Sequence, residues 1–459
     1  MTTASAQVES KSRGLSPGKL GLAACTALVI GNVIGSGVFL LPASLAPFGG
    51  LALIGWLVSC GGALLVALVF AKLAQIVPKT GGPYAYTRVG FGDFTGYLIA
   101  WGYWIGIWSS IAAVAVALVS YASGLVPALT TNPALSGLIA IGVVWLLTWV
   151  NLRGVQGAGK MQTITTILNL IPLVAVGTIG LLWTNWSNFA PTVPPQYSST
   201  LSAIAGAAAL TLFAFLGIES ATVPAGDVDN PSRTIPRATI AGTLIISAVY
   251  IFSTIGVMGA LPPEQLAASP APFADAAAAM WGDWAYPLVI IGAVISCFGA
   301  INGFILLQGQ VPLAAARDDL FPKRFARVSQ AGVPAFGCIV SSVLVTGLLL
   351  INTAGQLTGV KSLTDVYNGI ILLATFVTLV PYAFCAMAEL MIFIMRREQF
   401  KGERLRWASV VAVLAFIFSI ITIIGAGAQT VLYGFVLLLA GIPIYVWLKR
   451  TSSTTGMVA

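Results

Sequence analysis

Long apolar runs separated by short polar segments make up almost the whole chain. Each run is long enough to cross roughly 30 Å of hydrocarbon as a helix. The pattern predicts twelve spans, near residues 20–48, 51–76, 94–125, 133–152, 161–184, 201–224, 238–260, 284–315, 334–352, 366–394, 407–424 and 428–448. We therefore predict an all-α polytopic membrane protein without a soluble domain.

The basic residues agree with this number of spans. If the N-terminus lies inside, the inner segments carry 21 of the 22 Lys and Arg residues, and only Lys361 falls outside. The opposite orientation would violate the positive-inside rule at nearly every loop. We predict a multi-pass protein of the cell inner membrane, with residues 1–18 and 449–459 as cytoplasmic tails.

The composition changes the picture mainly by exclusion. The chain is 58% hydrophobic and 8% charged, and its net charge of +8 is spread thinly between the spans, which argues against a nucleic-acid partner. It contains no histidine, and its five cysteines lie in apolar runs as expected of buried free thiols. We find no metal-ligand cluster, phosphate-binding loop or catalytic set, so we predict neither a cofactor nor an enzyme.

Glycines interrupt the first span. Gly31, Gly35 and Gly37 lie at mid-membrane depth together with Asn32 and Ser36. Unwound backbone is tolerated there only where it lines a cavity or is buried in protein, and a helix that restarts there directs its N–H groups at an anion. The alternative is a small-residue packing face. The added polar residues favour a functional break.

The sixth span contains the second candidate break, at Gly217, followed by Glu219. A carboxylate within a span is costly and usually functional, although a protonated acid can also serve helix packing. We favour a functional role for Glu219. We expect Glu389, near the inner end of the tenth span, simply to reach water.

The two breaks suggest an inverted repeat within one transporter domain, residues 19–448. The repeats would cover residues 19–185 and 201–394, and residues 407–448 would add two helices. The charged inner loops could close the inner face through ion pairs, but ordinary turn chemistry is slightly favoured.

Several ordered motifs resemble one family. They are residues 31–42, 80–84, 215–219, 230–233 and 318–322. Together they resemble the amino acid–polyamine–organocation (APC) superfamily over about residues 18–448, and within it the basic amino acid/polyamine antiporters, especially the arginine/agmatine antiporters. The resemblance implies a LeuT-like five-plus-five fold, alternating access without ATP, exchange of an amino acid or amine, and a homodimer in the lipid bilayer.

The resemblance also implies roles for single residues. Ser36 and Gly37 would bind the substrate carboxylate, and the carbonyls of Val33, Phe213 and Leu216 would bind its amino group. Asn32 would support the break, and the pocket would be completed by Gly106, Ile111, Phe304 and Ala374. The residues of the predicted outer gate are Tyr103, Glu219 and Tyr382, with Phe213 and Phe304 as aromatic gates.

Some of these positions depart from the family pattern and make the pocket more apolar. Phe213 and Phe304 stand where the family has tryptophans, which hold a cation better. Ile111 replaces an Asn, and Ala374 replaces a hydroxyl residue. Asn169 stands where proton-coupled relatives and some exchangers have Lys, and the absence of this Lys slightly favours exchange over proton symport. The prediction is an amino acid/amine exchanger, and the alternative is a proton-coupled importer of neutral amino acids.

Overall fold

The computed structural model describes residues 20–34, 36–154, 170–223, 225–358, 363–396 and 405–455. Within these residues every named element is a helix, and the one β-bridge, between Leu20 and Val228, belongs to no strand. The predicted all-α polytopic class is confirmed. Asn169 and Lys361 lie outside the described residues.

Each of the twelve predicted spans coincides with a helix of the described chain. Nine helices there are long and apolar enough to cross a membrane, and shorter apolar helices occupy the other three positions. The spans include α3 (Leu51–Ile76), α7 (Pro133–Leu152), 170–179, α10 (Pro231–Ala260), α14 (Ala335–Leu357), α16 (Leu405–Gly425), α17 (Ala428–Leu439) and α18 (Gly441–Thr455).

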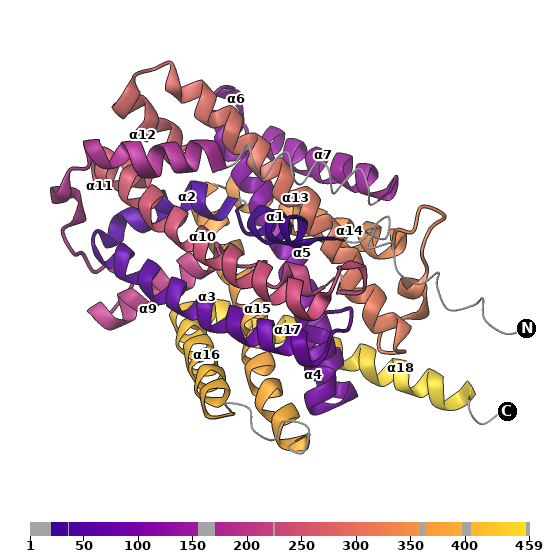
Figure 1. The fold of residues 1–459 in the computed structure, drawn as a ribbon. Coiled ribbons are helices and arrows are strands. Elements are labelled where there is room, and N and C mark those ends of the chain that lie inside the picture. The colour runs from indigo at the N-terminus through magenta and orange to yellow at the C-terminus, as the bar shows by residue number, and fades with distance from the viewer. Residues whose placement is uncertain are drawn as a thin grey trace, which may run out of the picture.

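The helices pack as two sets (Figure 1). One set is formed by α3, α10, the first helix α1 (Leu22–Val33) and α9 (Thr200–Phe213). In the other set, α5 (Asp93–Ser123) packs against α13 (Ala285–Arg317), α14 and α7. The helix α15 (Leu363–Met395) packs against α5 and also reaches α9 and α3, so it joins the sets.

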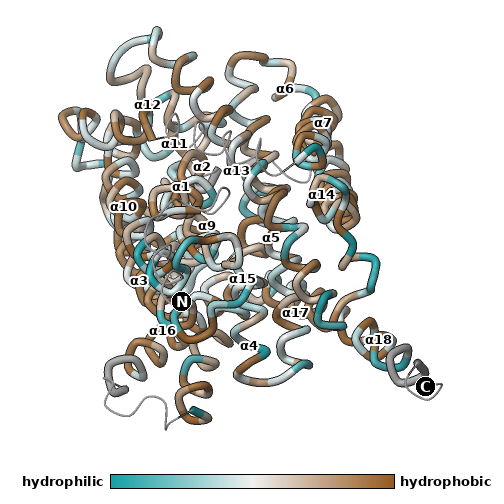
Figure 2. The backbone as a smooth tube through the Cα atoms, turned by 45° about the vertical axis from the view of Figure 1, so that its right-hand side comes forward, coloured by the Kyte–Doolittle hydropathy of each residue, from teal (hydrophilic) through white to brown (hydrophobic). Residues whose placement is uncertain are grey.

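Three short helices occupy segments that the hydropathy pattern left as loops. They are α4 (Pro83–Phe91), α11 (Pro263–Ala268) and α12 (Pro272–Trp281). Each begins with proline, whose fixed φ and missing N–H suit the first helical position. The helices α11 and α12 lie at one end of the bundle and α4 lies at the other (Figures 1 and 2). The short helices therefore cover opposite ends of the spans.

The helix α12 is tied to α5 and to α2 (Ser36–Leu45), the half-helix after the first break. The Tyr121 hydroxyl donates to the Phe39 carbonyl at 2.8 Å and accepts from the Phe273 N–H at 3.2 Å. The rings of Phe39 and Phe273 are 5.3 Å apart. One tyrosine of α5 thus connects the half-helix to the short helix above it.

We expect the packing of α12 against the bundle to be more stable in acid. Burial raises the pKa of Asp275 in α12, against the effect of the hydrogen bond from Ser269. The neighbouring groups in electrostatic range are Tyr121 and Tyr286. A raised pKa means that the folded state binds the proton more tightly than the unfolded state does. The protonated Asp275 therefore adds to the free energy of unfolding. This contribution is complete below the ordinary Asp pKa and is lost as pH rises through the raised value.

The variant Asp275→Asn should therefore be more thermally stable than the wild type, and this difference should grow as pH rises from 4 to 8. Asn stands in for the neutral acid and avoids the desolvation cost. The exposed Asp283→Asn provides the matched control and should show no such trend. A stability difference for Asp275→Asn that is independent of pH would contradict the assignment.

Candidate functional site

The first break is present. The helix α1 ends at Val33, where Ile34 leaves the helical conformation with ψ of 79°, and α2 begins at Ser36. Gly35 and the side-chain surroundings of Ser36 and Gly37 lie outside the described residues. The glycines and polar residues of the first span predict that the helix restarts at Val38, and in the structure it restarts two residues earlier. The predicted carboxylate role of Ser36 and Gly37 stays a prediction.

The second break faces the first. The helix α9 ends at Phe213, residues 214–219 form turns, and a single 3₁₀ turn follows at Ser220–Thr222. Gly217 has a φ of +106°, and a Cβ added there would lie 3.3 Å from the Cβ of Asn32. Only glycine combines this backbone conformation with such a close approach. The two breaks therefore meet at Asn32 and Gly217.

Unpaired polar groups mark this meeting point. Asn32 is 1% exposed, and neither atom of its amide makes a hydrogen bond within the described chain. The Ser220 hydroxyl, near Gly217, is also unpaired there. Buried polar groups normally have partners, so unpaired groups in a native structure point to a ligand or water. The predicted role of Asn32 in supporting the break stays a prediction.

Glu219 lies just beyond the second break, between two tyrosines. Its side chain is 2% exposed, and Tyr103 of α5 donates to Oε1 at 2.5 Å. The Tyr382 hydroxyl of α15 donates to the other carboxyl oxygen. The three predicted gate residues thus come together from two helices and the turn that follows α9. The carboxylate can accept the two tyrosine hydrogen bonds and still has lone pairs for a cation.

The cluster lies closer to one end of α5 and of α15 than to the other. Tyr103 is the eleventh residue of α5, which begins at Asp93, and Tyr382 is thirteen residues before the end of α15 at Met395. At 1.5 Å per residue, both lie about 15–20 Å from the ends that the loop charges place inside. The predicted role of Tyr103, Glu219 and Tyr382 as an outer gate stays a prediction.

Two carbonyls predicted to bind the substrate amine already accept hydrogen bonds. The Tyr250 hydroxyl donates to the Val33 carbonyl at 2.8 Å, and the Leu216 N–H donates to the Phe213 carbonyl at 3.1 Å. A carbonyl has two lone pairs, so a second donor can still bind. Tyr250 was missed from the sequence because nothing in the pattern of α10 sets it apart.

The side-chain end of the predicted pocket is apolar. Ile111 and Ala374 are fully buried, and Phe213 and Phe304 are nearly so. The Phe213 ring lies edge-on to Tyr367, with centroids 6.2 Å apart.

Gly106 lies at a close contact between two helices. A Cβ added to Gly106 of α5 would lie 2.3 Å from the Thr378 hydroxyl oxygen of α15. The glycine thus permits the close approach of these two helices. The predicted contact of Gly106 with the substrate stays a prediction.

The chain matches the family model for amino acid permeases over residues 20–448. The chain belongs to the amino acid permease family. The permease is 35% identical over 415 residues to the cadaverine/lysine antiporter of Escherichia coli K12, which covers 89% of the chain and 90% of that protein. It is 31% identical over 427 residues to the putrescine transporter PotE of the same strain, covering 93% and 95%.

A third relative, PotE of Haemophilus influenzae, is 30% identical over 427 residues and covers 93% of the permease and 96% of the relative. The predicted membership of the APC superfamily is confirmed. The permease is a multi-pass inner-membrane transporter and not an enzyme.

Ion pairs link α4, α5, α18 and the segment after α13 at the face that the loop charges predict to be cytoplasmic. Arg88 of α4 contacts Asp318 after α13 at 2.6 Å and Asp93 at 2.8 Å. The Tyr84 hydroxyl donates to Asp318 at 2.7 Å. Burial raises the pKa of Tyr84, and the hydrogen bond to the Asp318 carboxylate raises it further. The Tyr84 hydroxyl therefore remains a donor at neutral pH. Lys449 of α18 reaches Asp93 at 3.4 Å.

We expect Asp318→Asn to weaken the contact between α4 and the segment after α13 and so to open this face of the permease more often. Partly exposed ion pairs contribute about 0.2–1 kcal/mol each, which corresponds to an increase in the open population of up to about fivefold. The native thiol of Cys385 reports it, because this buried Sγ lies 3.7 Å from the Pro83 carbonyl at the start of α4. With the other cysteines replaced, the variant should react faster with N-ethylmaleimide.

The adjacent Asp319→Asn is the matched control, since no ion pair to Asp319 is seen in the described chain. Equal labelling rates in wild type, Asp318→Asn and Asp319→Asn would exclude a closing role for the Asp318 pairs.

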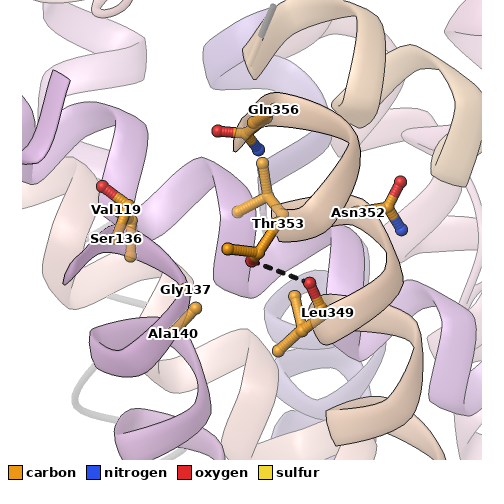
Figure 3. A pocket seen from close by; sticks show the side chains of 9 residues that line it. Val119, Ser136, Gly137, Ala140, Leu349, Asn352, Thr353 and Gln356 are labelled. Carbon is orange, nitrogen blue, oxygen red and sulfur yellow. Dashed lines mark hydrogen bonds between the residues drawn. The ribbon is translucent and has the colours of Figure 1, made fainter. Parts of the chain in front are cut away.

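A small pocket between α5, α7 and α14 is separate from the meeting point of the two breaks (Figure 3). Gly137 and Thr353 approach closely there, and Thr353 donates to the Leu349 carbonyl at 2.8 Å. The volume open to the centre of a water molecule is about 20 Å³. This holds about one water, which excludes the pocket as an amino-acid site.

Proposed function

We propose that the permease exchanges a basic amino acid for its decarboxylated diamine, or for another amino acid, by alternating access. The observation that carries this proposal is the buried Glu219, held by Tyr103 and Tyr382 where the two broken helices meet. A buried carboxylate next to a substrate path favours cationic cargo. The relatives named for lysine with cadaverine and for putrescine support the same substrate class.

The surrounding pocket supports an aliphatic cation. The carboxylate of an amino acid would lie at the start of α2, near Ser36 and Gly37, where free N–H groups favour an anion. The buried Ile111 and Ala374 would contact the methylene chain. We therefore favour lysine and its diamine over arginine and agmatine.

The sidedness, repeats and assembly belong to the same proposal. The loop charges support cytoplasmic termini, and the breaks in α1 and α9 support repeats at 19–185 and 201–394. The span at Ala428–Arg450 is only 17% buried within one chain, which leaves α17 and α18 available to lipid or to the second copy of a homodimer.

Exchange is tested in proteoliposomes. Uptake of labelled lysine should be at least about tenfold faster into vesicles loaded with lysine or cadaverine than into empty ones, because only loaded carriers return with cargo. Equal uptake into empty vesicles would refute obligate exchange. If an imposed pH gradient drives neutral amino acids into empty vesicles, the proton-coupled importer is the better assignment, and the apolar pocket is the observation in its favour.

A further inference from the structure

Glu389 is buried, although its sequence position near a helix end suggested access to water. Its side chain is 2% exposed, and its Oε2 makes no hydrogen bond within the described residues. Lys72 of α3 interacts with it electrostatically, and the Lys72 ammonium also lies 5.7 Å from the centroid of the Phe393 ring. Leaving a carboxylate oxygen buried and unpaired is costly, so its presence calls for a ligand.

Glu389 lies on the same face of α15 as the Glu219 cluster. It follows Tyr382 by seven residues, which is two helical turns toward the inner end. Cys385 lies between them, in electrostatic range of Glu219. The face is covered by α4, where a Cβ added to Gly90 would lie 3.0 Å from the Cβ of Ala388. The carboxylates of Glu219 and Glu389 therefore lie at two successive depths along α15, beneath the same covering helix α4.

A second unpaired polar group lies between these levels. Tyr86 of α4 is fully buried, and its hydroxyl makes no hydrogen bond in the part of the chain described. It interacts with Cys385 and lies near Thr222, which is three residues after Glu219. A tyrosine oxygen and a carboxylate oxygen, both unpaired, are acceptors of the kind that an ammonium group needs.

The charges of the substrates explain the need for two carboxylates. Among the described residues, Glu219 and Glu389 are the acidic side chains that are buried. A diamine carries two ammonium groups and no anion, whereas a basic amino acid brings its own carboxylate. Moving an unpaired charge into a protein interior costs several kcal/mol. A diamine therefore needs one more protein carboxylate than an amino acid does.

We propose that Glu389 binds the second ammonium group of a diamine on the inner half of the transport route. This ammonium displaces the Lys72 ammonium from the carboxylate. Without a diamine, Lys72 balances the carboxylate. When a diamine arrives, its ammonium takes the place of the Lys72 ammonium, whose flexible four-carbon stem lets it withdraw. The Tyr86 hydroxyl accepts a further hydrogen bond from the bound ammonium. This inference rests on the proposed exchange of amino acids for diamines.

The experiment compares two substrates at the inner face. Exchange of labelled cadaverine and of labelled lysine is measured in oriented proteoliposomes for wild type, Glu389→Gln and Lys72→Gln. Glu389→Gln should raise the KM for cadaverine about tenfold more than the KM for lysine. Lys72→Gln should instead lower the KM for cadaverine, because a competing cation is removed. The exposed Glu264→Gln is the matched control for loss of one acidic charge.

The outcomes separate this inference from the proposed function. Equal changes for both substrates, or none, would overturn the role of Glu389. If Glu389→Gln does not reach the membrane, Lys72→Gln decides, and a cadaverine KM that is unchanged or raised refutes the exchange of cations. If wild type carries neither cadaverine nor lysine, the proposed function itself fails.

Discussion

Replacing Glu219 by Gln should reduce exchange of labelled lysine by about ten- to hundredfold. Hydrogen bonds to charged groups contribute about 1.5–3 kcal/mol, and the substitution removes the charge while keeping the size of the side chain. Gln also presents one amide N–H₂ to the two tyrosine donors, so Tyr103 or Tyr382 must turn from donor to acceptor. Counterflow in proteoliposomes at matched protein content measures the rate.

Companion variants separate the charge from the hydrogen bonds. Tyr103→Phe and Tyr382→Phe each remove one donor but keep the carboxylate and the other tyrosine, so each should cost about tenfold, or about 1.5 kcal/mol, at the low end of the range for a hydrogen bond to a charged group. We also expect Glu219→Gln to flatten the pH dependence of exchange more than it changes substrate affinity, since a titrating group is lost. A variant with the wild-type rate and pH profile would show that Glu219 only packs helices.

The hydropathy pattern and loop charges were enough to predict the spans. Two predicted spans, 51–76 and 133–152, coincide with α3 and α7 at both ends. This success has a physical reason, because the bilayer requires long apolar helices with their backbone hydrogen bonds satisfied internally. The same pattern cannot reveal α4, α11 and α12. These helices lie at the ends of the bundle, where water relaxes that requirement.

The candidate site was predicted less completely. The breaks could be read from clustered glycines, but the contact between Asn32 and Gly217 depends on how two distant helices cross. Residues such as Tyr250 act through one hydroxyl on an ordinary apolar helix, so their spacing carries no signal. Glu389 was misjudged for a related reason. Its place near a helix end suggested exposure, whereas α3 and α4 cover it.

Replacing Gly217 by Ala should abolish most exchange while leaving a folded protein. A non-glycine residue at a φ of +106° stores about 1–3 kcal/mol of strain. The added Cβ would also lie 3.3 Å from the Cβ of Asn32 and 3.4 Å from the Ser220 hydroxyl. Relief of this strain must move the second break away from the first, which separates Glu219 from the meeting point of the helices.

The control is Gly61→Ala in α3, where an added Cβ meets nothing within 4 Å and the site is exposed. That variant should keep the wild-type rate and stability, because alanine is the better helix former. For Gly217→Ala we expect a loss of exchange of at least about tenfold and a thermal midpoint lowered by a few degrees. Exchange at the wild-type rate would mean that the backbone at Gly217 can relax without disturbing the site, and the close meeting of the two breaks would not be required for transport.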